Sequence, residues 1–179
     1  YIGDGYATTV GGYQIARACH DTLMRDGRAA YVAARDGRLT TAVENIIEAN
    51  TLLSGLGFEN CGVSGAHGIH DALTVLEPVH HFLHGEKVAF GVLCLLVLEN
   101  RPPAEFEEAL SFCRDVGLPT TLADLGLKDA SAADIARVGE AAMVPTNVIH
   151  SVPVKLTARA ISDAIWTASH LAERGKAAG

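Results

Sequence analysis

The sequence lacks several features that would assign a function at once. No GxGxxG follows a predicted strand, and GxxxxGK[ST] and GxSxG are both missing. The chain therefore shows no dinucleotide loop, no phosphate loop and no nucleophile elbow. Basic residues are also scarce, because 14 Lys and Arg stand against 21 Asp and Glu and form no stripe. Nucleic acid and anionic membrane surfaces are not expected partners.

Long hydrophobic runs and paired cysteines are lacking as well. The longest apolar run, Val88–Leu98, reaches about half of the roughly 20 residues that a membrane-spanning helix needs. The four cysteines are scattered, include no CxxC pair and follow no signal peptide; they are Cys19, Cys61, Cys94 and Cys113. We therefore expect free, buried thiols in a reduced, cytoplasmic protein.

Apolar residues are abundant and recur at helical spacing. They make up 49% of the chain, which is enough to fold around a core. No segment has sustained β alternation, so we predict an all-α fold over residues 1–179, as one domain or two small ones. The expected helices lie at residues 13–24, 41 to Gly55 or Gly57, around 67–76, 86–99, 104–116 and 131–142, with a last helix that begins after Thr157. Asp26-Gly27 should stop the first helix, Thr40 or Thr41 should cap the second, and Thr157 should cap the last.

Five of the eight histidines fall between His67 and His84. Glu77-Pro78 should end the helix that carries His67 and His70, so His67 and His84 lie on different segments. Two histidines and one carboxylate form a recurrent zinc site with an open fourth position. The candidate carboxylates are Asp71, Glu77, Glu86 and Asp4. The alternative is structural: His80 and His81 as solvated loop residues and His70 as a hydrogen-bonded core residue.

The helix that carries His67 starts with almost no side chains. Gly62, Gly65, Ala66 and Gly68 occupy this stretch, although a glycine within a helix costs about 1 kcal/mol relative to alanine. We therefore expect another group to approach the backbone of this helix closely. Tight helix packing and room for a small ligand beside a metal are both consistent with the pattern.

The sequence is also consistent with two other hypotheses for the role of the histidines. His70-Asp71 is an HD dipeptide, as in helical metallo-phosphohydrolases, but that class would also need His20 and Asp124, which lie at unfavourable separations. A metal that only holds helices together, in a closed four-ligand site completed by His70 or His81, is the second alternative.

Residues 57–91, GFENCGVSGAHGIHDALTVLEPVHHFLHGEKVAFG, closely resemble the glycerol dehydrogenases of the iron-containing (group III) alcohol dehydrogenase superfamily. The GFE start, the AHxIH element and the HGEKVAFG element occur in the family's order and spacing. The similarity continues upstream through VENIIEANTLLSGLG and downstream through GLPTTLADLGL and IHSVP, so it covers nearly the whole chain.

This resemblance implies a particular domain organisation. The family combines an N-terminal α/β domain that binds NAD with a C-terminal helical domain, like that of dehydroquinate synthase-like proteins, which supplies the metal and binds substrate. Residues 1–179 match the helical domain alone. Because the sequence begins YIGDGYATTV without an initiator methionine, we expect it to be part of a longer protein whose NAD-binding domain is absent here.

The resemblance also implies site residues and an activity. The family's metal ligands correspond to Asp4, His67 and His84, and Phe58 matches an aromatic residue beside the glycerol pocket. The iron-binding branch has a histidine where this chain has Thr8, which favours Zn2+. The implied reaction is NAD-dependent oxidation of glycerol to dihydroxyacetone, in a homo-oligomer that resembles an octamer. Relatives continue the helix after IGDxxAT for several turns before a glycine pair, whereas TTVGGYQIARA follows here. Either this stretch is deleted, which would change the placement of Asp4, or residues are missing from this sequence.

Overall fold

The computed structural model describes residues 7–177, and every regular element in that range is a helix. This confirms the all-α prediction. The chain divides into two compact units, Tyr1–Val63 and Ser64–Gly179, each described here by itself. No helix among the described residues is long and apolar enough to cross a membrane.

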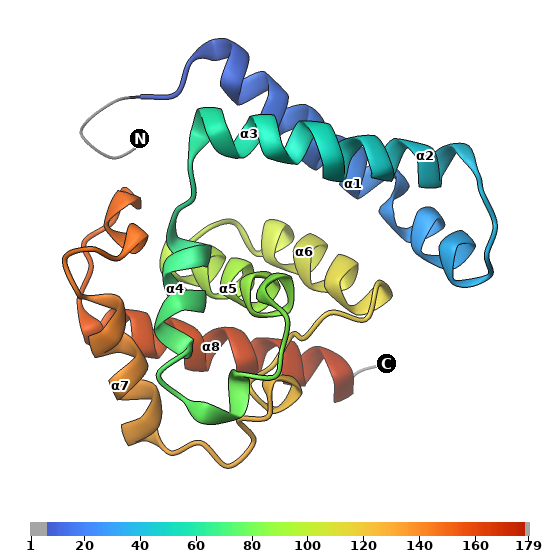
Figure 1. The fold of residues 1–179 in the computed structure, drawn as a ribbon. Helices are drawn as coiled ribbons and strands as arrows, with labels where there is room; N and C mark the ends of the chain where they lie inside the picture. Colours follow the sequence, from blue (N-terminus) through green and yellow to red (C-terminus); the bar gives the residue numbers. More distant parts are fainter. Residues whose placement is uncertain (1–6, 178–179) are drawn as a thin grey trace. The chain divides into compact units, whose positions relative to one another are not determined.

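The first unit is a helical hairpin. Helix α1 (Val10–Arg35) forms one arm, and α2 (Thr41–Glu48), the π-helical segment η1 (Ala49–Leu53) and α3 (Ser54–Cys61) follow one another to form the second (Figure 1). Helix α1 contacts all three elements of the second arm. As predicted, Thr40 caps α2, with its hydroxyl accepting a hydrogen bond from the Val43 N–H.

Two predicted helix ends in this hairpin are wrong. Helix α1 does not stop at Asp26-Gly27 but runs on to Arg35, because Gly27 is buried and the Asp26 carboxylate accepts a 2.8 Å hydrogen bond from Asn45 on α2. The second arm passes through Gly57, where a Cβ would lie 3.4 Å from Ala16 Cα. In both places contact with the other arm offsets the helical cost of glycine.

The second unit contains the remaining helices. They are α4 (Gly65–Leu73), the 3-10 turn η2 (Glu77–Val79), α5 (His84–Leu98), α6 (Pro103–Asp115), the 3-10 turn η3 (Ala123–Leu125), α7 (Ala132–Ala142), the 3-10 turn η4 (Val148–Ser151) and α8 (Ala158–Ala177). Helix α5 contacts α4, α6 and α8, which confirms that the most apolar helix is the central one. Its side chains Phe90, Leu93 and Cys94 are fully buried.

Local signals at the ends of these helices behave as predicted. Ser131 caps α7, and the Thr157 hydroxyl accepts a hydrogen bond from the Ala160 N–H at the start of α8. Gly117 follows α6 with a positive φ of 76°. Along α8, the buried stripe is Ile161, Ile165, Ala168 and Ala172.

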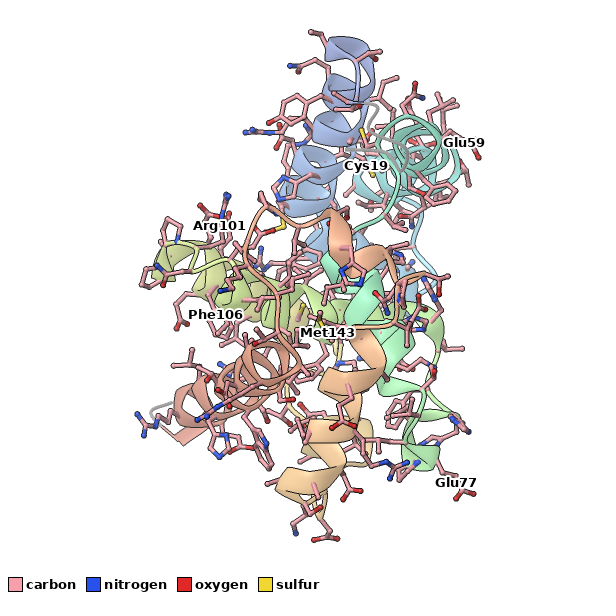
Figure 2. The ribbon with its side chains drawn as sticks, turned by 90° about the vertical axis from the view of Figure 1, so that its left-hand side faces the viewer. Cys19, Glu59, Glu77, Arg101, Phe106 and Met143 are labelled. Atoms are coloured by element: carbon pink, nitrogen blue, oxygen red, sulfur yellow. The ribbon has the colours of Figure 1, made fainter. Side chains whose placement is uncertain are left out.

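Exposed charged residues and the thiols of both units complete the description of the fold. Phe106 on α6 is buried, whereas Glu77 and Arg101 lie at the surface (Figure 2). All four cysteines are free, but only Cys94 and Cys113 are buried. Burial raises the pKa of the Cys113 thiol to about 11 and that of Cys94 further, so both are unreactive thiols of the core.

Candidate metal-binding site

Helix α4, which carries His67, is held tightly by its neighbours. A Cβ at Gly65 would lie 2.5 Å from Leu95 Cδ1 and 2.8 Å from Val152 Cγ1. On α5, Gly91 lies directly against the Ala66 carbonyl. These glycines therefore allow close helix packing, which was one of the two predictions for this stretch. The expectation of room for a small ligand is wrong at Gly65, where protein atoms fill the space, whereas nothing lies within 4 Å of a Cβ added at Gly62.

The turn after α7 fastens the other side of α4. Asn147 Nδ2 donates a 3.1 Å hydrogen bond to the Gly68 carbonyl, while Asn147 Oδ1 accepts from the Ile149 N–H at 2.8 Å. The Ser151 hydroxyl donates to Ser64 Oγ at 2.9 Å, just before α4 begins. The sequence gives little indication that Asn147 has this role. Its only signal was its place beside the IHSVP element.

The HGEK element places His84 at the first position of α5. Glu86 Oε2 accepts a 2.7 Å hydrogen bond from the Leu83 N–H, which closes a capping interaction around the helix start. Lys87 is 7% exposed, and its Nζ donates to the carbonyls of Phe82 at 2.9 Å and Val79 at 3.4 Å. In the sequence, this role of Lys87 is indicated only by the presence of a lysine in the most apolar helix. Together these bonds hold the chain that leads into His84.

Three histidines meet where α4 and the start of α5 come together. The ring centroids of His67 and His84 are 5.2 Å apart, and those of His70 and His84 are 4.4 Å apart in an edge-to-face arrangement. His70 Nδ1 lies 2.8 Å from Asp71 Oδ1. The structure thus brings the two predicted histidine ligands together from separate segments and adds His70 to them.

The environment favours neutral imidazoles at two of these positions. Burial lowers the pKa of His67 below its ordinary value, and the neighbouring His84 and His70 lower it further. The pKa of His70 is also lowered, chiefly by burial, although the Asp71 hydrogen bond acts in the opposite direction. Neutral imidazole is the form that binds a metal ion, so this donor chemistry suits zinc.

Residues 7–177 hold no group of three His, Cys, Asp or Glu side chains arranged to bind a metal ion. Asp4, the predicted third ligand, lies outside the described residues. Thr8, which stands where the iron-binding branch has histidine, donates a 2.9 Å hydrogen bond to the Asn60 carbonyl. Of the three predicted ligands, His67 and His84 are the two that lie among the described residues.

The other predicted residues fall in three settings. His80 and His81 are exposed, and His80 Nε2 lies 2.7 Å from the Thr74 carbonyl. Phe58 is 54% exposed on α3, so it is not a core residue. The Asp124 carboxylate accepts hydrogen bonds from Thr120 and Thr121 in its own turn, a structural role that lends the phosphohydrolase reading no support.

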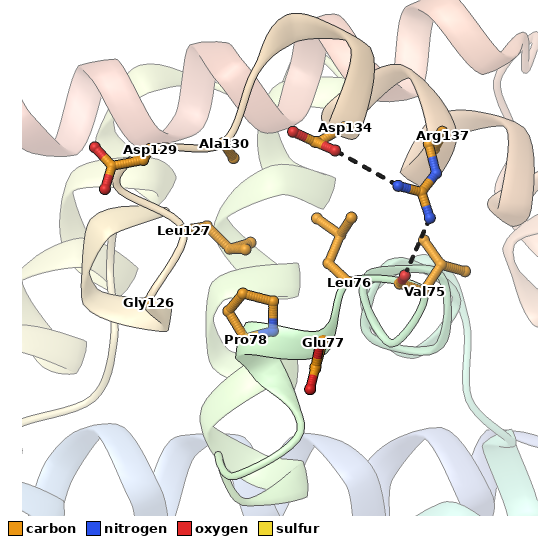
Figure 3. A pocket seen from close by; sticks show the side chains of 10 residues that line it. All are labelled: Val75, Leu76, Glu77, Pro78, Gly126, Leu127, Asp129, Ala130, Asp134 and Arg137. Atoms are coloured by element: carbon orange, nitrogen blue, oxygen red, sulfur yellow. Dashed lines mark hydrogen bonds and ion pairs between the residues drawn. The ribbon is translucent and has the colours of Figure 1, made fainter.

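A separate groove of about 610 Å3 lies between the segment after α4 and the start of α7 (Figure 3). At its rim Arg137 Nη1 is 3.5 Å from Asp134 Oδ1, and Arg137 Nη2 is 3.5 Å from the Val75 carbonyl. None of the three clustered histidines lines it. We therefore assign it no part in the candidate site.

The chain is similar to several glycerol dehydrogenases in sequence and in structure, and in sequence also to a glycolaldehyde reductase from Halobacterium salinarum. The chain is 47% identical to a glycerol dehydrogenase from Citrobacter freundii over 170 residues, which are 95% of this chain and 47% of that protein. It superposes on the crystal structure of a probable glycerol dehydrogenase from Sinorhizobium meliloti with a TM-score of 0.91 and 60% identity, covering 94% of this chain and 48% of the other.

A further solved structure, glycerol dehydrogenase from Schizosaccharomyces pombe, gives a TM-score of 0.90 at 40% identity and covers 95% of this chain and 44% of its own. The chain thus spans about half the length of the relatives it matches, in their C-terminal part. No protein-family model matches the sequence.

Proposed function

This chain is homologous to the C-terminal part of glycerol dehydrogenases, and we propose on that premise that it supplies the metal and substrate site for NAD-dependent oxidation of glycerol to dihydroxyacetone. The single observation that carries the proposal is the meeting of His67 and His84, whose rings are 5.2 Å apart although they come from separate segments. These are the two histidines that match the family's ligand positions.

In this proposal His67, His84 and Asp4 hold a zinc ion. When bound, zinc supplies Lewis acidity toward the hydroxyl groups of glycerol. His67 contributes a neutral nitrogen donor, because burial disfavours its protonated form. Asp4 contributes negative charge that offsets the charge of the cation. Phe58 is proposed to face the carbon skeleton of the substrate, a role compatible with its exposed side chain.

The proposal assigns NAD to an α/β domain outside these 179 residues, by the family resemblance. An NAD bound there would accept a hydride from the secondary carbon of glycerol, and the hydroxyl proton would be released to solvent. Holding the two reactants at near-attack distance can supply about 7–11 kcal/mol of the barrier. The helical chain's part is to bind and orient the alcohol. Assembly into a homo-oligomer, an octamer by resemblance, belongs to the same proposal.

The ligand assignment is tested by zinc content. In the full-length enzyme, His67→Ala and His84→Ala should each abolish stoichiometric zinc when measured by elemental analysis. His80→Ala is the matched control, because His80 is an exposed histidine of the same region. Equal zinc in all three variants would refute the assignment. Four protein nitrogen or oxygen ligands with no exchangeable water, seen by X-ray absorption, would instead favour a purely structural metal.

A further inference from the structure

His84 lies at the surface with little to hold its ring in place. It is an exposed residue at the first position of α5, and within residues 7–177 its ring makes no hydrogen bond. A histidine that binds a metal is usually fixed by a second partner that sets the orientation of its ring. Its ring contacts among the described residues are those with the imidazoles of His67 and His70.

His70 is the nearer of these two rings and is itself held in place. Its centroid lies 4.4 Å from that of His84 at an interplanar angle of 66°, against 5.2 Å and 44° for His67. The His70 side chain is only 12% exposed, and its Nδ1 donates to Asp71 Oδ1 at 2.8 Å, since a carboxylate can only accept. The ring of His70 is therefore fixed by burial on one side and by Asp71 on the other.

We propose that His70 is a positioning residue: oriented by Asp71, its ring packs edge-to-face against His84 and holds that imidazole in the orientation that binds the metal. The inference rests on the proposed function, because it takes His84 as a ligand. His70 follows His67 by three residues on α4, so both lie on the same helix face. One short helix thus supplies a ligand and the support for a second ligand that lies on another element.

The test measures metal binding rather than turnover. In the full-length protein, His70→Ala should weaken zinc affinity about tenfold, the lower end of the effect of losing a second partner of a metal-binding histidine. Chelator competition measures this affinity. His70→Phe, which keeps an aromatic ring against His84, should restore most of it. Asp71→Ala should weaken binding less than His70→Ala, and His80→Ala, the matched control, should not weaken it.

A cobalt-substituted protein adds a readout of ligand orientation. His70→Ala should shift or broaden the visible d–d bands of Co2+, while His80→Ala leaves them unchanged. Because Asp71 is 57% exposed, Asp71→Ala gives an independent test that does not threaten folding. If His70→Phe binds zinc as weakly as His70→Ala, His70 is a ligand or a proton donor and not a ring support, which overturns the inference.

His84→Ala distinguishes a failure of the ligand assignment from a failure of the positioning role. If it keeps full zinc affinity, the ligand assignment fails and the positioning role falls with it. If it loses zinc while His70→Ala matches the wild type in affinity and in the Co2+ spectrum, the assignment stands and only the positioning role is overturned.

Discussion

The backbone carbonyl of Ala66 lies directly against Gly91, where α4 packs on α5. Ala66 precedes His67, and Gly91 lies on the helix that begins with His84. The spacing between the two histidine-bearing helices therefore depends on the absence of a side chain at position 91.

Gly91→Ala should separate these helices. A Cβ at this position would clash with backbone that cannot rotate away, and overpacking of this kind typically costs about 1–3 kcal/mol. We expect a lower urea midpoint together with weaker zinc binding. Gly85→Ala is the matched control on the same helix, because nothing lies within 4 Å of its added Cβ. Equal urea midpoints for the two variants would show that the α4–α5 contact can accommodate the added methyl group.

Lys87→Met should destabilise the turn that leads into His84. The part-buried carbonyl of Phe82 would lose its ammonium donor, whereas the Val79 carbonyl would keep its bond from the Phe82 N–H. Leaving a buried polar group unpaired costs about 1–3 kcal/mol. Thermal unfolding measures the loss. Lys128→Met, at an exposed position, is the control and should change little. An unchanged melting temperature for Lys87→Met would mean that water replaces the lysine without cost.

Phe58→Ala in the full-length enzyme should lower kcat/KM for glycerol. Expressed as a free energy, this loss should exceed the loss in the free energy of unfolding. The side chain is 54% exposed, so its removal leaves no cavity in a core. Phe90→Ala gives the contrast, because Phe90 is fully buried and truncation of a buried Phe costs about 3–5 kcal/mol. Unchanged kinetics with a large loss of melting temperature for Phe58→Ala would argue against a substrate contact.

The metal-free protein should lose stability as the pH falls below about 6.5, the ordinary pKa of histidine. The pKa values of His67 and His70 are lowered in the folded state, so the unfolded chain binds protons first. Folding then opposes protonation, and the free energy of unfolding decreases through that range as the pH falls. Urea titrations between pH 5 and 7.5 measure the slope. His67→Gln should reduce this slope. Identical slopes for the wild type and the variant would contradict a lowered pKa of His67 in the folded state.

The 179-residue chain, purified with zinc, should bind the metal but should not oxidise glycerol with NAD+ above background. It has no recognisable dinucleotide loop, and every described element is a helix. Absorbance of NADH at saturating glycerol measures the rate. Adding a nucleotide-binding domain, fused or in trans, should restore activity. An ordinary enzymatic rate from the chain alone would place the cofactor site among these helices.

The features that the sequence by itself determined are local ones. Thr40 and Thr157 cap the helices that they were predicted to cap, and Ser131 caps the helix that was predicted to begin there, because a capping hydroxyl reaches an N–H within three residues of itself. Gly117 ends α6 for an equally local reason, a left-handed backbone angle. The all-α class and the central position of the most apolar helix follow from residue spacing and composition.

Only the tertiary structure decided what each glycine does and where the histidines meet. A glycine costs a helix about 1 kcal/mol, so contact with a residue far along the chain can outweigh it, as Ala16 does at Gly57. The 5.2 Å approach of His67 to His84 depends likewise on packing at Gly91 and on the side-chain bond from Asn147 to the Gly68 carbonyl. Such contacts join distant residues, and no local pattern encodes them.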